Sequence, residues 1–374
     1  MERRAKGCFG YNLRHLSLLV LVLSFGMPVS RTNGEARTDS VHPPALRLGI
    51  LGDSSSDEFR GDDDRGGAYA STTRNWLELL VRYRGVDAGA WGNRPPPRRQ
   101  GYEFNWALSG ATTAEAISAT AVDGLERQVT NDKLSAVVVM VGANDFAIWN
   151  GTYGRIYSGD LAGEALRRSN AAIVERIRMA VEAIFRAGTP KIFVATLLDR
   201  SDLPRFQAEF PDASRRRRVS DSIAEINADI RSLADTHRIF LVDQYAVSQR
   251  VMERLDKGGH LVIGGIAFDA ASPGDEPHHL QLGDDEHLGT VGSGMLANLI
   301  TDAFRGAGIC IAAFTDAEIL ANAGIGYPRS RTGMSVGLAA APSDVRILVV
   351  AGSGSGHGDD CSEGHGGASS QSSP

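Results

Sequence analysis

Residues 46 to 54 read LRLGILGDS, a short apolar run that ends in Gly-Asp-Ser. An apolar run this short, bounded by turn-forming residues, is typical of a buried β-strand. Its last residues then lie in a loop at the carboxyl end of the strand, where open α/β sheets place most of their binding and catalytic groups. This stretch therefore predicts the first strand of a buried sheet and a loop that is available for chemistry.

Three further segments repeat this pattern, each short, apolar throughout and rich in β-branched or aromatic residues. They are Ala136 to Val141 (AVVVMV), Lys191 to Thr196 (KIFVAT) and Ile239 to Val242 (IFLV). Strands of this kind are covered on both faces, as in parallel sheets. One more strand is expected at Tyr102 to Trp106, although Glu103 and Asn105 make it polar.

Segments with helical periodicity alternate with these strands. They are Thr72 to Val81, Leu161 to Ala187, Ala213 to His237 and Gly289 to Phe304. Strands that alternate with helices predict a parallel sheet between two helical layers. The expected fold class is therefore α/β, a three-layer α/β/α sandwich with a flavodoxin-like parallel sheet of about five strands.

The bulk composition points to a globular protein and argues against nucleic-acid binding. The chain has 374 residues, of which 42% are hydrophobic, so it can bury a sizeable core. Its formal net charge is −6, with no broad basic field that would draw it to a polyanion. The basic run Arg215 to Arg218 is read as a solvated helix face.

The amino-terminal segment predicts export. Four basic residues precede an apolar stretch from Leu16 to Phe25, which is followed by Gly26, Pro28 and small residues up to Ser30. This is the pattern of a secretory signal peptide, residues 1–30, with cleavage near Ser30. The apolar stretch is shorter than the roughly 20 residues that span a bilayer, so a permanent anchor is less favoured and no stable membrane span is expected after cleavage. The predicted location is secreted, periplasmic or at the cell surface.

The carboxyl-terminal part divides into three regions. We expect the main domain over residues 43–309, an extension over 310–350 with a short helix at Asp316 to Ala323, and a low-complexity tail over 351–374. Whether the extension packs on the domain is left open. Cys310 and Cys361 either pair in an oxidising compartment or stay as free thiols.

Candidate catalytic residues follow the predicted strands. Ser54 lies in LGDSSSDE, Gly110 in NWALSGATT, Asn144 in VGANDF, and Asp284 and His287 in GDDEHLGT before the last helix. A serine hydroxyl becomes a nucleophile when a base takes its proton, a third group orients that base, and donors face the oxyanion. Each motif alone also fits an ordinary turn or helix cap. Their joint occurrence at the ends of predicted strands favours the catalytic reading.

These motifs, in this order, resemble the SGNH/GDSL hydrolase family over about residues 46 to 304. The resemblance implies that Ser54 is the nucleophile, His287 the general base and Asp284 its partner. It also implies an oxyanion hole formed by the Ser54 N–H, the Gly110 N–H and the Asn144 side-chain amide. Ser55, Ser56, Asp285 and Glu286 are neighbouring candidates that the family spacing passes over.

The resemblance implies a serine esterase or acylhydrolase that acts through an acyl-enzyme, and the amino-terminal signal sequence implies that it is exported. Its substrate would be a small-molecule, glycan or lipid ester, with carbohydrate deacetylation as the first hypothesis. Transferase and thioesterase activity share the same intermediate and stay open. The alternative from another class is a non-catalytic carbohydrate-binding or surface-attachment module on the same fold.

An aromatic loop follows Asn144. Phe146, Trp149, Tyr153 and Tyr157 either form a substrate wall or pack on the domain, and Phe146 and Trp149 are the candidate substrate-binding residues. No cofactor and no metal are expected, because the proposed chemistry needs neither. The acidic run Asp62 to Asp64 is read as a solvated loop, and the tail with its histidines as at most a weak metal binder.

Overall fold

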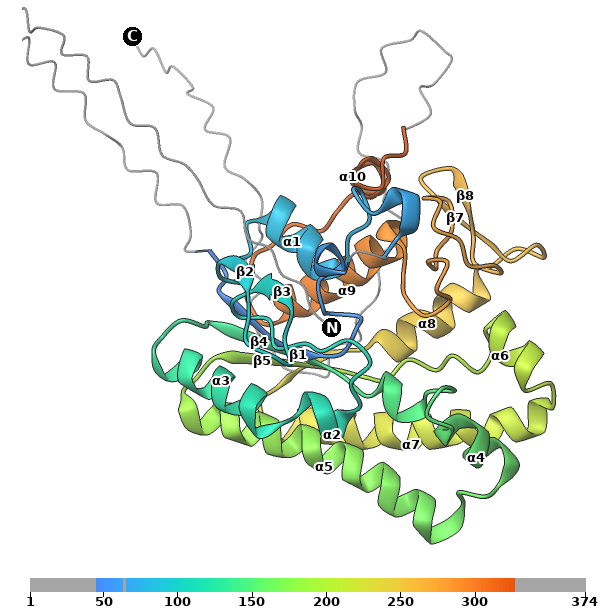
Figure 1. Ribbon diagram of the computed structural model, residues 1–374, viewed down its shortest axis with the longest axis horizontal. Helices are drawn as coiled ribbons and strands as arrows, with labels where there is room; N and C mark the ends of the chain where they lie inside the picture. Colours follow the sequence, from blue (N-terminus) through green and yellow to red (C-terminus); the bar gives the residue numbers. More distant parts are fainter. Residues whose placement is uncertain (1–44, 63–64, 327–374) are drawn as a thin grey trace, which may run out of the picture. The chain divides into compact units, whose positions relative to one another are not determined.

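The computed structural model describes residues 45–62 and 65–326. Its centre is a parallel sheet of four strands in the order β1-β4-β5-β6. These are β1 (Leu48–Gly52), β4 (Ala136–Met140), β5 (Lys191–Ala195) and β6 (Phe240–Val242). Figure 1 shows this sheet edge-on between two layers of helices. The predicted three-layer α/β/α sandwich is therefore confirmed, with one strand fewer than the expected five.

Both faces of the sheet are buried, which explains the uninterrupted apolar runs in the sequence. Along β4, Val138 and Met140 belong to one hydrophobic core, and Val137 and Val139 belong to the other. Successive side chains of a strand point to opposite faces, so a strand covered on both sides has no polar position.

Long helices cover the two faces. On one side lie α1 (Trp76–Arg84) and α9 (Thr290–Gly306), and on the other lie α3 (Ala119–Thr130), α5 (Gly163–Ala187) and α7 (Ala213–Thr236). The first of these begins later than Thr72, because Asn75 accepts from the Glu78 N–H and Glu78 accepts in return from the Asn75 N–H. Such a capping box satisfies two backbone donors that a helix start otherwise leaves open.

The strand expected at Tyr102 to Trp106 is wrong as a full strand. Here the chain pairs with β1 only at Ile50, whose N–H donates to Phe104 O and whose carbonyl accepts from the Trp106 N–H. The Asn105 side chain is buried and bonds to the Ser56 carbonyl and the Ala107 N–H, so it bends the chain away. A separate antiparallel hairpin, β2 (Trp91–Asn93) and β3 (Gln100–Tyr102), precedes this point.

Several short elements were not expected from the sequence. They are η1 (Phe59–Gly61), η2 (Gly67–Tyr69), α2 (Thr113–Ala116), η3 (Ala143–Phe146), α4 (Thr152–Ser158), α6 (Pro204–Glu209), α8 (Gln244–Glu253) and the hairpin of β7 (His260–Ile263) and β8 (Ile266–Asp269). Most of them lie in the connections that follow strand carboxyl ends, and η3 contributes Ala143 and Asn144 to the pocket described below.

The beginning of the extension packs on the main fold. Helix α10 (Asp316–Asn322) buries Ile319 and Leu320, and Ile319 lies against Gly294 of α9. Cys310 is disulfide-bonded, while Cys8 and Cys361 lie outside the described residues. The signal peptide, the tail and the domain boundaries likewise stay predictions. Within residues 45–62 and 65–326, no helix is long and apolar enough to cross a bilayer.

Candidate active site

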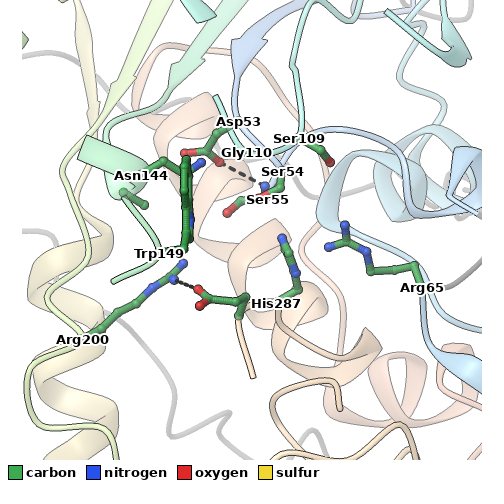
Figure 2. A pocket seen from close by; sticks show the side chains of 12 residues that line it. Asp53, Ser54, Ser55, Arg65, Ser109, Gly110, Asn144, Trp149, Arg200 and His287 are labelled. Atoms are coloured by element: carbon green, nitrogen blue, oxygen red, sulfur yellow. Dashed lines mark hydrogen bonds and ion pairs between the residues drawn. The ribbon is translucent and has the colours of Figure 1, made fainter. Parts of the chain in front are cut away.

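A pocket opens at the carboxyl edge of the sheet and encloses about 440 Å³ when the space at its mouth is included. Its wall includes Ser54 after β1, Gly110 after the Ile50 pairing, Asn144 after β4 and His287 before α9. Parallel strands deliver their carboxyl ends to one edge, so residues far apart in sequence meet there. Figure 2 shows these side chains around one space, with the His287 ring directed toward the two serines.

Asp284 orients His287. Its Oδ2 accepts from His287 Nδ1 at 2.7 Å, and its Oδ1 accepts from the Glu286 and His287 N–H groups at 3.0 Å each. Between them Asp285 adopts a positive φ of 57°, a conformation that Asp tolerates better than most residues. Because Nδ1 is engaged by the carboxylate, Nε2 is the nitrogen left to face the pocket.

The Asp284 carboxyl is held in its ionised form. Burial raises the pKa of Asp284, but the His287 hydrogen bond and charge, the backbone N–H of Glu286 and the nearby Arg65 together hold that pKa well below its usual range. The His287 side chain is only 11% exposed and packs edge-on against Phe59, with ring centroids 5.9 Å apart. The pair therefore combines a fixed carboxylate with an imidazole whose orientation is restricted.

The segment after β1 places two of its three serines at the pocket and buries the third. Asp53 is buried and accepts from the Ser55 N–H at 3.0 Å, and burial raises the pKa of its carboxyl. Ser56 is fully buried and accepts from the Trp76 indole N–H at 3.2 Å. Ser54 and Ser55 both line the pocket, whereas Ser56 does not.

Two potential hydrogen-bond donors, Gly110 and Asn144, line the pocket together with His287. Gly110 has a φ of +76°, and among the described residues no atom lies within 4 Å of the place where a Cβ would stand. Its backbone is thus open to a ligand at close range. The Asn144 amide donates one hydrogen to the Ala111 carbonyl at 3.0 Å, which fixes the amide and leaves its other hydrogen available.

Arginines face all three consecutive carboxylates of the His287 loop, a feature that sequence reasoning missed. Arg65 approaches Asp284 at 3.6 Å, Arg205 approaches Asp285 at 3.7 Å, and Arg200 pairs with Glu286 at 2.6 Å. Arg65 comes from the segment after β1, whereas Arg200 and Arg205 come from the connection between β5 and α7, and the sequence carries no spacing signal that links them to residues 284–286.

The aromatic loop separates into two roles. Trp149 is 63% exposed and lines the pocket, whereas Phe146 and Tyr153 are buried in the hydrophobic core. Tyr153 packs against Phe206 and Phe210 with ring centroids 5.0 and 4.6 Å apart. Phe146 is not among the residues that line the pocket, so Trp149 is the aromatic side chain of this loop that a ligand can reach.

Asp62, which was expected in a solvated acidic loop, is instead partly buried and paired with two arginines, while Asp63 and Asp64 lie outside the described residues. Asp62 pairs with Arg65 at 3.0 Å and with Arg99 at 3.1 Å. Over the described part of the chain, no group of three or more His, Cys, Asp or Glu side chains has the arrangement of a metal site.

Residues 48–300 match the model of a protein family described as GDSL-like Lipase/Acylhydrolase. The matched region spans more than half of the chain and contains every residue that lines the pocket. The chain belongs to the GDSL-like lipase/acylhydrolase family. It is accordingly a hydrolase that acts on ester bonds, as the four sequence motifs predicted.

Solved structures similar to this GDSL-family chain include several esterases. A diltiazem-metabolizing enzyme of a gut microbe is 17% identical with a TM-score of 0.38, covering 69% of this chain and 46% of its own. A lipase from a goat rumen metagenome is 13% identical (TM-score 0.41, 69% and 97% covered). A carbohydrate esterase family 3 protein from Talaromyces cellulolyticus is 15% identical (TM-score 0.37, 70% and 97% covered). No curated protein matches the sequence.

A second, more apolar pocket adjoins the first in this GDSL fold. It lies beneath the His287 loop, encloses about 670 Å³ including open space, and is lined in part by Met140, Leu197 and Leu296. The paired side chains of Arg200 and Glu286 line both pockets. Asp53, Ser55 and Ala143 also line both pockets, so the ion pair is part of a border that the two pockets share.

Proposed function

We propose that this GDSL-family protein hydrolyses carboxylic esters through an acyl-enzyme formed on Ser54. Ser54 Oγ attacks the ester carbonyl carbon while His287 Nε2 takes its proton, and the carbonyl oxygen becomes an oxyanion. Collapse of this intermediate breaks the bond to the alcohol, and His287 returns the proton to the leaving oxygen. Water then attacks the acyl-enzyme in the same manner and releases the carboxylic acid.

The observation that carries this proposal is the 2.7 Å hydrogen bond between Asp284 and His287 at the edge of the pocket that Ser54 lines. A carboxylate at Nδ1 selects the tautomer with a free Nε2 and stabilises the imidazolium formed during proton transfer. Asp284 is well suited to this role, because its environment keeps its pKa low and its charge in place.

Donors for the oxyanion come from three loops. In the proposal they are the N–H groups of Ser54 and Gly110 and the free amide hydrogen of Asn144. The positive φ of Gly110 and the open space beside it favour a close approach of the substrate oxygen. The bond from Asn144 to Ala111 supports this role, since a donor fixed in advance needs no reorganisation during the reaction.

We propose a short acyl group, with acetylated carbohydrate as the substrate class. The partly buried Arg200–Glu286 pair lies on the border that the Ser54 pocket shares with the more apolar pocket, so a long acyl chain that entered the second pocket would have to pass this ion pair. The exposed Trp149 at the pocket offers a flat apolar face on which a sugar ring could stack.

A fluorophosphonate probe tests the nucleophile. The wild-type protein is expected to be labelled, Ser54→Ala to lose labelling, and Ser55→Ala to keep it. Ser55 is the matched control, because it also lines the pocket and follows directly in sequence. Well-folded wild-type protein that takes no label would contradict the proposal and favour a carbohydrate-binding module.

The acyl group is tested with p-nitrophenyl esters of increasing chain length beside acetylated oligosaccharides. We expect kcat/KM to be highest for acetyl esters and to fall from butanoyl onward. A preference for long chains would overturn the short-acyl proposal while leaving the Ser54 mechanism intact.

We also propose that the protein is exported, on the strength of its amino-terminal sequence alone. Expression of the full chain in a secreting bacterial host should yield a mature protein that begins close to residue 31. Recovery of the intact chain inside the cells would contradict this proposal.

A further inference from the structure

A chain of alternating charges connects the two sides of the pocket. Asp57 pairs with Arg99 at 2.7 Å, Arg99 with Asp62 at 3.1 Å, Asp62 with Arg65 at 3.0 Å, and Arg65 with Asp284 at 3.6 Å. Its two ends are the loop before Gly110 and the partner of His287. Apart from the local pair of Asp62 and Arg65, these pairings join residues that lie far apart in the sequence.

At one end, Asp57 holds the loop that carries Gly110. Its Oδ2 accepts from the Ser109 N–H at 2.9 Å and from Arg99 Nη2 at 2.7 Å. The same Arg99 nitrogen also donates to Ser109 Oγ at 3.2 Å. The residue directly before Gly110 is thus bound through both its backbone and its side chain.

At the other end, Arg65 is placed between the acid and the aromatic ring that packs on the base. The Arg65 side chain is 9% exposed, and its guanidinium lies 4.9 Å from the centroid of Phe59. Phe59 is the ring that contacts His287 edge-on. Arg65 Nη1 forms an ion pair with Asp284 at 3.6 Å and has no hydrogen-bond partner among the described residues.

The segment that carries Arg65 is also docked on the loop that carries Asp284. Asp275 accepts from the Gly283 N–H at 3.0 Å, directly before Asp284. Gly67, with a φ of +50°, lies so near that a Cβ there would stand 2.5 Å from Asp275 Oδ2. A shift of either segment would therefore displace the other.

We propose that Arg65 and Arg99 are positioning residues that hold the Gly110 loop and Asp284 in one fixed relation through the intervening Asp62. The inference rests on the proposed function, since it assigns these arginines a role in the same reaction. In this proposal neither arginine side chain contacts the reacting atoms. They act because a displacement of donors or base of about 1 Å lowers the rate by up to roughly 100-fold.

Because this series of ion pairs is partly buried, its members depend on one another. Side-chain exposure is 9% for Asp57 and Arg65, 22% for Asp62, 36% for Arg99 and 39% for Asp284, so the series is most buried at Asp57 and Arg65. Removing one charge leaves its neighbour without a partner in a poorly solvated place, so that the neighbour moves or rotates away. Loss of either arginine is therefore expected to loosen the same positioning of the Gly110 loop relative to Asp284.

The test is a double-mutant cycle with Arg65→Gln, Arg99→Gln and the double variant. We measure kcat and KM with p-nitrophenyl acetate, together with the thermal midpoint. Arg178→Gln is the matched control, because Arg178 also pairs with two carboxylates, Glu175 and Glu182, but on the exposed face of α5. It should leave kcat within about twofold of wild type.

Each single variant is expected to lower kcat at least roughly 10-fold with KM within about threefold, because substrate contacts are kept while geometry is lost. The double variant should be little slower than the worse single one. Asp62→Asn removes the charge in the middle of the ion-pair series and should reproduce the loss of kcat. It replaces Arg65→Gln in the test if that variant does not fold.

Folded Arg65→Gln or Asp62→Asn protein with unchanged kcat would overturn the inference, as would losses that multiply in the double variant. Arg65→Lys should recover part of kcat, since it restores the charge but cannot bridge two carboxylates with two nitrogens. Wild-type protein without turnover or probe labelling would overturn the proposed function itself, which is a distinguishable result.

Discussion

Asp284 Oδ2 lies 2.7 Å from His287 Nδ1, and this contact decides which imidazole nitrogen faces Ser54 across the pocket. Asp284→Asn is expected to lower kcat by roughly 10³-fold to 10⁴-fold, because the amide favours the wrong tautomer and supports the imidazolium poorly. Steady-state kinetics with p-nitrophenyl acetate measures the loss.

The control for that substitution is Asp285→Asn. Asp285 is the next residue, faces Arg205 at 3.7 Å, and needs a positive φ that Asn also tolerates. Its kcat should stay within a few-fold of wild type. Equal losses in both variants would mean that the loop tolerates neither change and that Asp284 has no special role.

Glu58 makes the stability of the protein depend on pH. Burial raises the pKa of Glu58 to about 7, outweighing the hydrogen bond that it accepts from the Tyr102 N–H. In the unfolded chain its pKa is about 4.5, so the folded state binds the proton more tightly. Stability from this group is fully present below about pH 4.5 and is lost as pH rises through about 7.

Glu58→Gln should remove this dependence, because Gln stays neutral and its carbonyl can still accept from Tyr102. Between pH 4.5 and pH 8 the wild type should therefore lose on the order of 3 kcal/mol more of its free energy of unfolding than the variant does. Urea unfolding of both proteins at the two pH values gives the comparison. Parallel pH slopes for wild type and variant would contradict the assignment.

Gly110→Ala separates backbone strain from loss of function. A residue with a Cβ at φ +76° costs roughly 1 kcal/mol in stability. Gly151 is the matched control, since its φ is +77° and its Cβ position is equally open among the described residues. Both variants should lose similar stability in thermal unfolding.

Gly110→Ala, but not Gly151→Ala, should also lose kcat/KM, by roughly 10-fold to 100-fold, because its methyl group enters the space of the substrate oxygen. Retained activity in Gly110→Ala would remove this residue from the proposed oxyanion hole.

Trp149→Ala tests the sugar-stacking surface. Because this side chain is 63% exposed, its removal should leave the thermal midpoint nearly unchanged. We expect KM for an acetylated oligosaccharide to rise roughly 5-fold to 30-fold, with kcat/KM for p-nitrophenyl acetate unaffected. Tyr83→Ala, at an exposed aromatic of α1 that lines neither pocket, is the control. Unchanged KM would place sugar binding elsewhere.

Elements with strong local periodicity could be predicted, whereas weakly marked ones could not. Helices α5 and α7 lie within a few residues of their expected bounds, because long amphipathic segments with clear stops leave little choice. The strand at Tyr102 to Trp106 was wrong: the buried amide of Asn105 bonds locally to the Ala107 N–H and, over a long range, to the Ser56 carbonyl, a contact that no local pattern records.

The sequence alone specifies the family motifs and the succession of strands along the chain, because a catalytic group at a strand end needs only a local apolar run followed by a turn. Folding decided the rest. Phe146 turned into the core while Trp149 stayed at the pocket, and Arg65 and Arg99 met carboxylates far away in sequence. Ion pairs of this kind form wherever packing brings loops together, so their partners appear only once the sheet has gathered its carboxyl ends at one edge.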